Sequence, residues 1–250
     1  MLKIIQVGNV EASNRYIRNK MKAVQDAGLT AELIHLPEDA TTWDVEKNLY
    51  FASMDKKCKA VLVQLPLPDH IDKDRVFRAI PEHLDIDGLN PRSRYQPLTP
   101  CAIMRWLSEQ NIHLTAKNVA ILGKSNLVGK PLATMMMDAG ATVTVLNSKT
   151  PRREAYNFCR RADIIVSAVG KPNTVNINHI MTGEPQIIID VGINRDADGK
   201  LCGDVSAEVR EIFAETGDIC TPVPGGVGKW TVRELVERLK YMEHAPVHMH

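Results

Sequence analysis

The chain has 250 residues, a length that allows one large domain or two modest ones, and either can bury a hydrophobic core. Its 31 Lys and Arg residues nearly balance 30 Asp and Glu residues, so the net charge is +1. This balance argues against nucleic-acid binding through bulk charge and against disorder. We find no apolar run of the roughly 18 residues that a membrane helix needs, and no signal peptide. The five cysteines form no CxxC pair, which argues against a disulfide framework or a metal site. We therefore expect a soluble protein of the reducing cytoplasm.

Short apolar, β-rich runs alternate with helical patterns along the chain, which is typical of an α/β fold with a parallel sheet. The expected strands cover residues 2–7, 60–64, 118–122, 142–146, 164–169 and 187–191. The expected helices cover about 12–27, 44–57, 100–110, 129–139, 152–161 and 231–242. Between them, residues 85–99 are rich in turn formers. We therefore predict two lobes, residues 1–115 and 116–230, followed by a helix (about 231–250) that is long enough to pack back on the first lobe.

A strand, a tight glycine loop and a helix start follow one another between residues 119 and 131. Backbone N–H groups and the positive end of a helix dipole attract phosphate at such a place. The loop fits neither a Walker A motif nor a GxGxxG fingerprint, because positions 118 and 125 are Asn118 and Ser125. The alternative is an ordinary glycine turn. With that alternative open, Gly123, Lys124 and Ser125 are candidate cofactor contacts.

The next strand ends at Ser148 and Lys149, without the carboxylate that usually binds the ribose hydroxyls of NAD. Neutral donors and lysines suit a 2′-phosphate, so the pattern favours NADP, although both lysines could be ordinary solvated side chains. Glycine turns that contain Gly170 and Ile193 follow two further strands. Ligands collect at the carboxyl ends of such strands, so these turns could flank a nicotinamide ring.

Tyr16 and Lys20 are neighbours on one face of the first helix, at the edge of its apolar stripe. Partial burial would disfavour the charged form of the lysine and make it a usable base. The alternative is an amphipathic lysine beside a core tyrosine. Gln64 ends a strand that two prolines stop from continuing, so it could orient a substrate or the lysine, or merely cap the strand.

Two further segments carry candidate residues. Residues 85–88 place Asp85 and Asp87 beside a turn glycine, where the alternative is a solvated turn. Residues 221–228 contain two prolines and three glycines just before a helix. Such a composition indicates that a ligand approaches the backbone closely.

Taken in order, these motifs resemble the bifunctional methylenetetrahydrofolate dehydrogenase/methenyltetrahydrofolate cyclohydrolase family, from about Val7 to about Leu239. The helix that carries Tyr16 and Lys20 is similar to the family's YxxxK helix. The other matching segments are residues 63–68 (VQLPLP), 85–88 (DVDG in the family), 97–100 (PxTP), 123–131 (GRSxIVGxP) and 224–228 (PGGVG). Their joint order makes the resemblance specific.

The resemblance implies a two-lobed α/β fold, with a folate-binding catalytic lobe, a Rossmann-like NADP-binding lobe, folate in the cleft between them and a last helix that returns to the first lobe. It implies a catalytic Lys20 partnered by Gln64, and folate held by Tyr16 and Asp87. The implied substrate contacts also include Val63, Leu65, Pro224, Gly225, Gly226, Val227 and Gly228. The implied NADP contacts are Gly123, Lys124, Ser125, Ser148, Gly170 and Ile193.

The implied activity is oxidation of 5,10-methylene-tetrahydrofolate by NADP, followed by hydrolysis of the methenyl product to 10-formyl-tetrahydrofolate. The family also implies a homodimer. The chain departs from the family at Leu84, Lys124, Asn147 and the Lys229-Trp230 pair, and the helix that precedes the family's first strand is expected to be absent. Two alternatives stay open: retention of only one activity, and a non-catalytic folate or dinucleotide binder.

Overall fold

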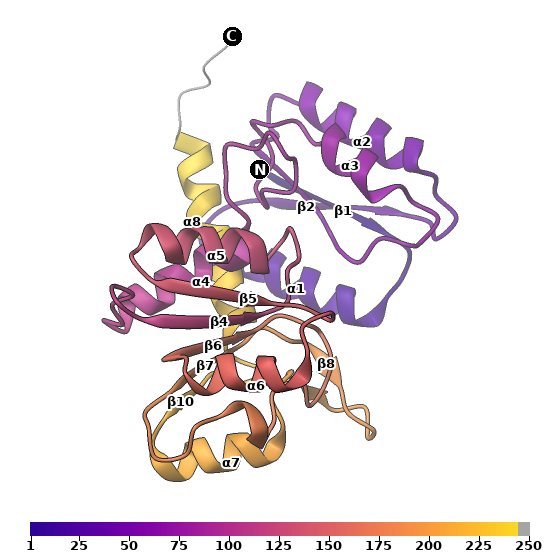
Figure 1. Cartoon of the computed structure of the whole chain (residues 1–250). Coiled ribbons are helices and arrows are strands. Elements are labelled where there is room, and N and C mark those ends of the chain that lie inside the picture. The colour runs from indigo at the N-terminus through magenta and orange to yellow at the C-terminus, as the bar shows by residue number, and fades with distance from the viewer. Residues whose placement is uncertain (245–250) are drawn as a thin grey trace. The chain divides into compact units, whose positions relative to one another are not determined.

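The computed structural model describes residues 1–244 and confirms the predicted α/β class (Figure 1). The chain divides into two compact units: one contains Met1–Leu98 and the chain from Val232 onward, and the other is Thr99–Thr231. The division comes earlier than the expected one at 115/116, because Ile103, Leu107 and Leu114 belong to a core of the second unit. Of the expected last helix, residues 245–250 lie outside the described part.

The first unit contains a three-stranded parallel sheet in the order β2-β1-β3. Its elements are β1 (Leu2–Val7), α1 (Glu11–Asp26), β2 (Ala31–Leu36), α2 (Thr42–Met54), β3 (Ala60–Val63) and α3 (Lys73–Ala79). All four residues of β3 are buried, as a central apolar strand requires. The core joins Ile4 of β1 and Ile17 of α1 to Leu235 and Leu239, so the chain after Val232 completes this unit.

The second unit contains a five-stranded parallel sheet in the order β10-β7-β6-β4-β5. Its strands are β4 (Asn118–Leu122), β5 (Thr142–Leu146), β6 (Ile164–Ser167), β7 (Ile187–Asp190) and β10 (Ile219–Cys220), beside a small hairpin of β8 (Asn194–Arg195) and β9 (Leu201–Cys202). Its helices are α4 (Leu98–Glu109), α5 (Gly129–Asp138), α6 (Arg152–Arg160), a 3-10 turn (Ile177–His179), α7 (Ala207–Thr216) and the start of α8 (Val227–His244).

Two apolar layers sandwich this second sheet. On one face α4 and α5 pack against β4, β6 and β7, and on the other face α6 and α7 pack against the same strands (Figure 1). The chain leaves the carboxyl end of β4 toward β5 on one side, and β6 lies on the other side. Strand order therefore reverses at β4, the place where α/β sheets bind ligands.

All twelve expected elements occur within a few residues of their expected bounds. The sequence did not predict β2, α3, α7 or the short strands β8 to β10. The last helix starts at Val227 rather than at 231, because Val227 is buried in the second unit's core and the N–H of Trp230 donates to the carbonyl of Gly226. Val227 and Gly228 are thus helical rather than part of a loop.

Candidate active site

The first unit brings together two of the predicted catalytic residues. The ammonium nitrogen Nζ of Lys20, on α1, lies 3.0 Å from Oε1 of Gln64. Gln64 follows β3, and its Nε2 donates to the carbonyl of Leu65 at 2.6 Å. This second bond fixes the amide orientation, so that the oxygen faces the lysine. The pair joins elements that lie 44 residues apart in the chain.

Burial shifts the titration of both Lys20 and Tyr16. Burial lowers the pKa of Lys20, and the nearby charge of Asp87 only partly opposes this effect. A lysine with a lowered pKa has a larger neutral fraction near neutral pH and can accept a proton. Tyr16, one helical turn earlier on α1, is half-buried, and burial raises the pKa of its hydroxyl.

Asp87 occupies the same region with the opposite shift. Burial raises its pKa from 3.8 to about 6, while the charges of Lys20 and Arg238 oppose the rise and Asp85 adds to it. Asp85 is fully buried and accepts the N–H of Asn90 at 2.8 Å, and burial raises its pKa as well. Asp85 therefore stabilises the turn through a hydrogen bond, while Asp87, with a pKa of about 6, can change its charge near neutral pH.

Arg238, on α8, supports this turn and was not predicted from the sequence. Its Nη1 donates to the carbonyl of Ile86 at 2.9 Å and to the carbonyl of Gln96 at 2.7 Å. Its guanidinium lies 5.3 Å from the centre of the Tyr95 ring. Arg238 thus fixes the backbone next to Asp87. Its two carbonyl partners lie 152 and 142 residues earlier in the chain, so no local pattern signalled this role.

The two neighbours of Gln64 in the chain could contact a ligand mainly through their backbone. Val63 is 1% exposed and packs in the interior, so only its main chain could reach a ligand. Leu65 is half-buried and its carbonyl is already paired with Gln64.

In the second unit the predicted cofactor residues follow four adjacent strands. Ile193 follows β7, Gly170 follows β6, Gly123 to Ser125 follow β4, and Ser148 follows β5. The order of these strands across the sheet is β7-β6-β4-β5. Because the strands are parallel, all these residues lie along one edge of the sheet, centred on the point where strand order reverses.

The loop after β4 leaves no room for a side chain at Gly123 or Gly129. A Cβ on Gly129 would lie 2.0 Å from the carbonyl oxygen of Gly123. A Cβ on Gly123, whose φ is +111°, would lie 2.4 Å from the carbonyl oxygen of Ala168, in the turn after β6. Ser125 Oγ accepts the N–H of Val128 at 3.1 Å and closes the loop. This edge therefore suits a ligand that approaches the backbone, as a dinucleotide does.

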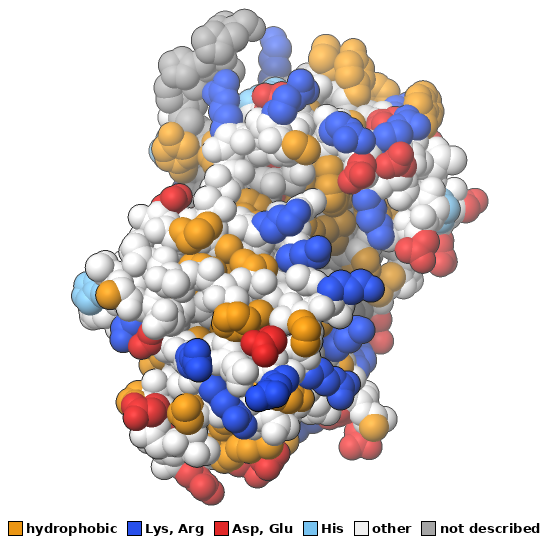
Figure 2. Space-filling view, in the orientation of Figure 1, with side chains coloured by type: hydrophobic (Ala, Val, Ile, Leu, Met, Phe, Trp, Pro, Cys, Tyr) orange, Lys and Arg blue, Asp and Glu red, His pale blue; other side chains and the backbone are white. Residues whose placement is uncertain are grey.

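Cationic and hydroxyl side chains surround the end of β5. Lys124, Ser148 and Lys149 are exposed, and α6 begins a few residues later with the exposed Arg152 and Arg153. Figure 2 shows Lys and Arg side chains gathered over α6. These groups could hold a phosphate outside the loop itself.

Residues 224–228 belong to the second unit: 224–226 form the turn that precedes α8, and Val227 and Gly228 are the first two residues of that helix. Pro224 and Gly225 are exposed, and Gly225 has a φ of +109°. A Cβ on Gly226 would lie 2.5 Å from the carbonyl oxygen of Pro222. The turn therefore needs its glycines for backbone geometry.

Two buried acids, Asp190 and Asp204, lie near the carboxyl ends of β6 and β7. The sequence analysis did not identify them as site residues. Asp190 ends β7, and Asp204 follows Gly203 in the segment after β9. Their signal in the sequence was an acid beside a glycine (Asp190-Val-Gly192 and Gly203-Asp204).

Residues 1–244 contain no group of three or more His, Cys, Asp and Glu side chains that could hold a metal ion. Within the same range no helix has the length and apolar character to cross a bilayer. All five cysteines are free thiols.

Two family profiles match the chain. The catalytic domain of the tetrahydrofolate dehydrogenase/cyclohydrolase family matches residues 1–87, and its NAD(P)-binding domain matches residues 97–245. The bifunctional protein FolD of Agathobacter rectalis is 38% identical over 244 residues, which cover 94% of this chain and 85% of that protein. The bifunctional protein FolD of Cupriavidus necator is 40% identical over 255 residues, covering 98% of this chain and 87% of that protein.

Solved structures agree with this match. The bifunctional FolD enzyme of Campylobacter jejuni superposes with a TM-score of 0.88 at 37% identity, covering 97% of this chain and 87% of that one. The dehydrogenase-cyclohydrolase of Trypanosoma brucei, solved with NADP and an inhibitor, gives a TM-score of 0.85 at 32% identity, covering 96% and 85%. Sequence, domain order and fold agree, and the chain belongs to the tetrahydrofolate dehydrogenase/cyclohydrolase family.

Proposed function

We propose that this chain oxidises 5,10-methylene-tetrahydrofolate with NADP to the methenyl form and hydrolyses that form to 10-formyl-tetrahydrofolate. The carrying observation is the contact of Lys20 with Gln64, together with the lowered pKa of Lys20. Membership of the family and the NADP-bound structure of a relative support both halves of the reaction.

In the hydrolytic half, water adds to the cationic methenyl carbon, and neutral Lys20 takes up a water proton, directly or through a second water. The bond from that carbon to N5 then breaks. One of the two water protons ends on N5 and the other is released. Gln64 accepts a hydrogen from Lys20 and thereby turns the lysine lone pair away from itself, toward the substrate. Lys20 is the catalytic base and Gln64 orients it.

Asp87 and Tyr16 hold the folate. With a pKa of about 6, Asp87 is mainly ionised at neutral pH and accepts hydrogen bonds from the pterin N–H groups. Tyr16 lies one turn from Lys20 on α1 and contacts the ring system. The backbone of Val63 and Leu65 completes the folate contacts that the first unit supplies.

In the oxidative half, bound NADP supplies the acceptor for a hydride from the methylene carbon. Ser148 and Lys124 hold its 2′-phosphate, and the backbone of residues 123–125 approaches the pyrophosphate. Gly170 and Ile193 flank the nicotinamide ring. These turns hold the nicotinamide ring in one orientation. The entropy of orienting it is then lost on binding and not in the hydride-transfer step, which lowers the barrier to that step.

Two assays on one preparation test the proposal. The first follows NADPH formation from methylene-tetrahydrofolate, with NAD as the comparison cofactor, and the second follows loss of supplied methenyl-tetrahydrofolate without any dinucleotide. We expect activity in both and a preference for NADP. Activity in one assay alone would support the single-activity alternative, for which the changes at Lys124, Asn147 and Lys229 are the candidate causes. Tight ligand binding with no turnover in either would support a pure binder.

We also propose that the enzyme works in the cytoplasm as a homodimer, without nucleic-acid or membrane partners. The family resemblance supports the dimer, and the net charge of +1 and the five free thiols support the compartment and the partner class. Light scattering at several protein concentrations tests the dimer: a mass of twice 27.8 kDa is expected.

A further inference from the structure

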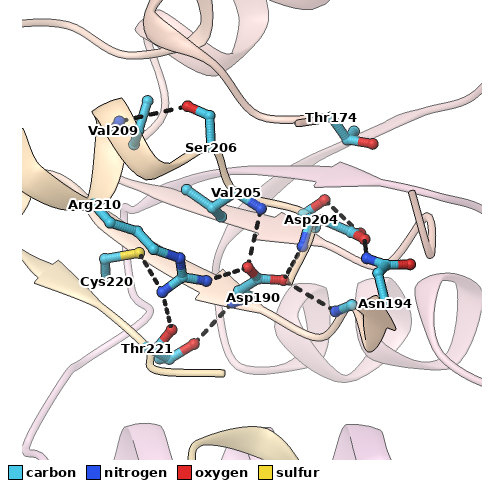
Figure 3. Close-up of polar contacts among 12 residues, drawn as sticks. Thr174, Asp190, Asn194, Asp204, Val205, Ser206, Val209, Arg210, Cys220 and Thr221 are labelled. Carbon is cyan, nitrogen blue, oxygen red and sulfur yellow. Dashed lines mark hydrogen bonds and ion pairs between the residues drawn. The ribbon is translucent and has the colours of Figure 1, made fainter. Parts of the chain in front are cut away.

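Two carboxylates are buried in the second unit beneath the proposed nicotinamide contacts. Asp190 is 1% exposed and Asp204 is completely buried. Figure 3 shows the two side chains next to one another, with Asn194 on one side and Arg210 on the other. Burying a carboxylate is costly unless hydrogen bonds and opposite charges replace water. The groups that bind these two acids therefore indicate what the acids are for.

Asp204 gathers five hydrogen-bond donors. Its Oδ2 accepts from the hydroxyl of Ser167 at 2.9 Å and from the N–H groups of Val169 and Gly170 at 2.9 and 3.1 Å. Its Oδ1 accepts from the N–H of Lys171 at 2.9 Å and from Nδ2 of Asn194 at 3.0 Å. Ser167 is the last residue of β6, the next three donors belong to the turn after β6, and Asn194 follows the turn after β7 as the first residue of β8. One carboxylate thus ties the two turns together.

Asp190 fixes the position of Asp204. Its Oδ1 accepts the N–H groups of Asp204 and Gly192 at 2.9 and 3.0 Å, and its Oδ2 accepts that of Val205 at 3.0 Å. Arg210 neutralises Asp190 through a close ion pair (Figure 3). Burial raises the pKa of Asp190, and the bonds from the N–H groups of Asp204 and Val205 and the charge of Arg210 oppose the rise.

Both carboxylates lie so close to the backbone that the residues they approach must be glycines. A Cβ on Gly192 would lie 2.0 Å from Oδ1 of Asp204, and a Cβ on Gly203 would lie 1.9 Å from Oδ2 of Asp190. Neither position tolerates a side chain without displacing an acid. Both neighbours of Ile193 are held by hydrogen bonds: Gly192 donates to Asp190, and Asn194 donates to Asp204. The position of the Ile193 backbone is fixed as a consequence.

We propose that Asp204 is a positioning residue for the nicotinamide end of NADP, an inference that rests on the proposed function. Asp204 holds Gly170 and Ile193 at a fixed spacing before the dinucleotide arrives, so that binding does not have to order two separate turns. The N–H groups of residues 169–171 all point at Asp204. These three N–H groups are therefore not available to a phosphate, and the main-chain acceptors that the turn still has, its carbonyl groups, suit the amide hydrogens of a carboxamide.

The variant Asp204→Asn tests this proposal. An amide nitrogen in place of one carboxylate oxygen would face at least two N–H donors, so the turns should separate. We expect the Kd and KM for NADP to rise about tenfold or more, with a lower rate of hydride transfer. Hydrolysis of supplied methenyl-tetrahydrofolate, which needs no dinucleotide, should stay within about twofold of the wild-type rate, because its base lies in the first unit.

Asp163→Asn is the matched control. Asp163 precedes β6 and accepts the N–H of Asn118 at 2.8 Å and Nζ of Lys117 at 3.1 Å. It also ties strand ends together, but at the opposite end of β6 from the proposed nicotinamide contacts. This variant should bind NADP as the wild type does. Equal losses in both variants would show a general loss of stability and overturn the proposal, as would unchanged NADP binding in Asp204→Asn.

Ser167→Ala covers the case in which Asp204→Asn does not fold. It removes one of the five donors from a fully buried position and adds no volume. We expect about a threefold rise in the Kd for NADP with hydrolysis unchanged, and an unchanged Kd would overturn the proposal. A wild-type enzyme that fails to reduce NADP would instead contradict the proposed function itself.

Discussion

The candidate site in the first unit is built from side chains, and the one in the second unit is built from backbone. In the first, burial disfavours the charged forms of both Lys20 and Asp87, which shifts their pKa values toward neutrality. In the second, Gly123 and Gly129 let main-chain segments approach within distances that no Cβ would allow. The first arrangement is suited to moving protons, and the second is suited to holding a large ligand in place.

This difference predicts opposite sensitivities to substitution. Truncating a single side chain should stop the chemistry of the first unit, because one atom carries the proton. Truncating a single exposed side chain at the cofactor edge of the second unit should have a small effect, whereas adding one methyl group to a glycine there should have a large effect. The following experiments test this contrast in order of expected effect.

The substitution Lys20→Met should have the largest effect. It removes the base but keeps most of the side-chain volume, so hydrolysis of methenyl-tetrahydrofolate should fall about 10³-fold while folate binding is largely retained. Stopped-flow absorbance and a folate-binding titration measure the two quantities. Lys22→Met is the control on the same helix, because Lys22 is exposed and paired only with Asp26 among the described contacts. Near-normal hydrolysis in Lys20→Met would remove the lysine from the mechanism.

The substitution Gly129→Ala should be nearly as severe for the cofactor. Its methyl group would lie 2.0 Å from the carbonyl oxygen of Gly123, so the loop must open and the Kd for NADP should rise about a hundredfold. Gly183→Ala is the control, since it places a methyl group in open space at a turn with a φ of +92°. Fluorescence titration with NADPH should show a change of at most about twofold in that control. If the two variants bind equally well, backbone approach does not define the second site.

Asp87 should give the folate affinity a pH dependence. Because its pKa is raised to about 6, folate binding should weaken as the pH falls through about 6, by about tenfold for each further unit. The folded chain also holds this proton more tightly than the unfolded chain does. Between pH 3.8 and about 6 the group therefore lowers the free energy of unfolding as the pH rises. Asp87→Asn should abolish the inflection in a binding titration, and its persistence there would assign it to another group.

The smallest effect is expected from Ser148→Ala. Loss of one hydroxyl contact to the 2′-phosphate should raise the KM for NADP about fivefold and leave that for NAD unchanged. Thr134→Ala removes an exposed hydroxyl that donates to the carbonyl of Lys130, on α5, and should change neither value. An equal rise for both cofactors would argue against a role specific to the 2′-phosphate.

The sequence predicts the elements whose pattern is continuous and local. The buried run of β3 has no polar residue and that of β6 has none before its last residue, Ser167, and they were identified for that reason. Strand β2 was missed because it is partly exposed and carries Glu32 and His35, so it shows no apolar run. Helix α7 was missed although Ser206 caps it and accepts the N–H of Val209, because its apolar residues are interspersed with acids.

The same limit applies to the candidate sites. Tyr16 and Lys20 were singled out because helical spacing places them together. Gln64 was singled out at a strand end and Asp87 beside a turn glycine, and the motif resemblance added their expected roles. Arg238 lies 152 residues from Ile86, whose carbonyl it binds, so no local pattern could reveal it. Asp204 likewise acts on Ser167 from 37 residues away. Residues that position others through long-range contacts become visible only in three dimensions.

The return of the chain after Val232 has a consequence for the order of assembly. Because residues 99–231 form an insertion within the first unit, a ribosome releases the whole second unit before it releases Leu235 and Leu239. Domains generally fold in the order in which they are synthesised. Here the second unit can mature first, whereas the unit that contains Lys20 and Gln64 must wait for the last helix to fill its core. The half of the protein that begins the chain is therefore the half that finishes folding.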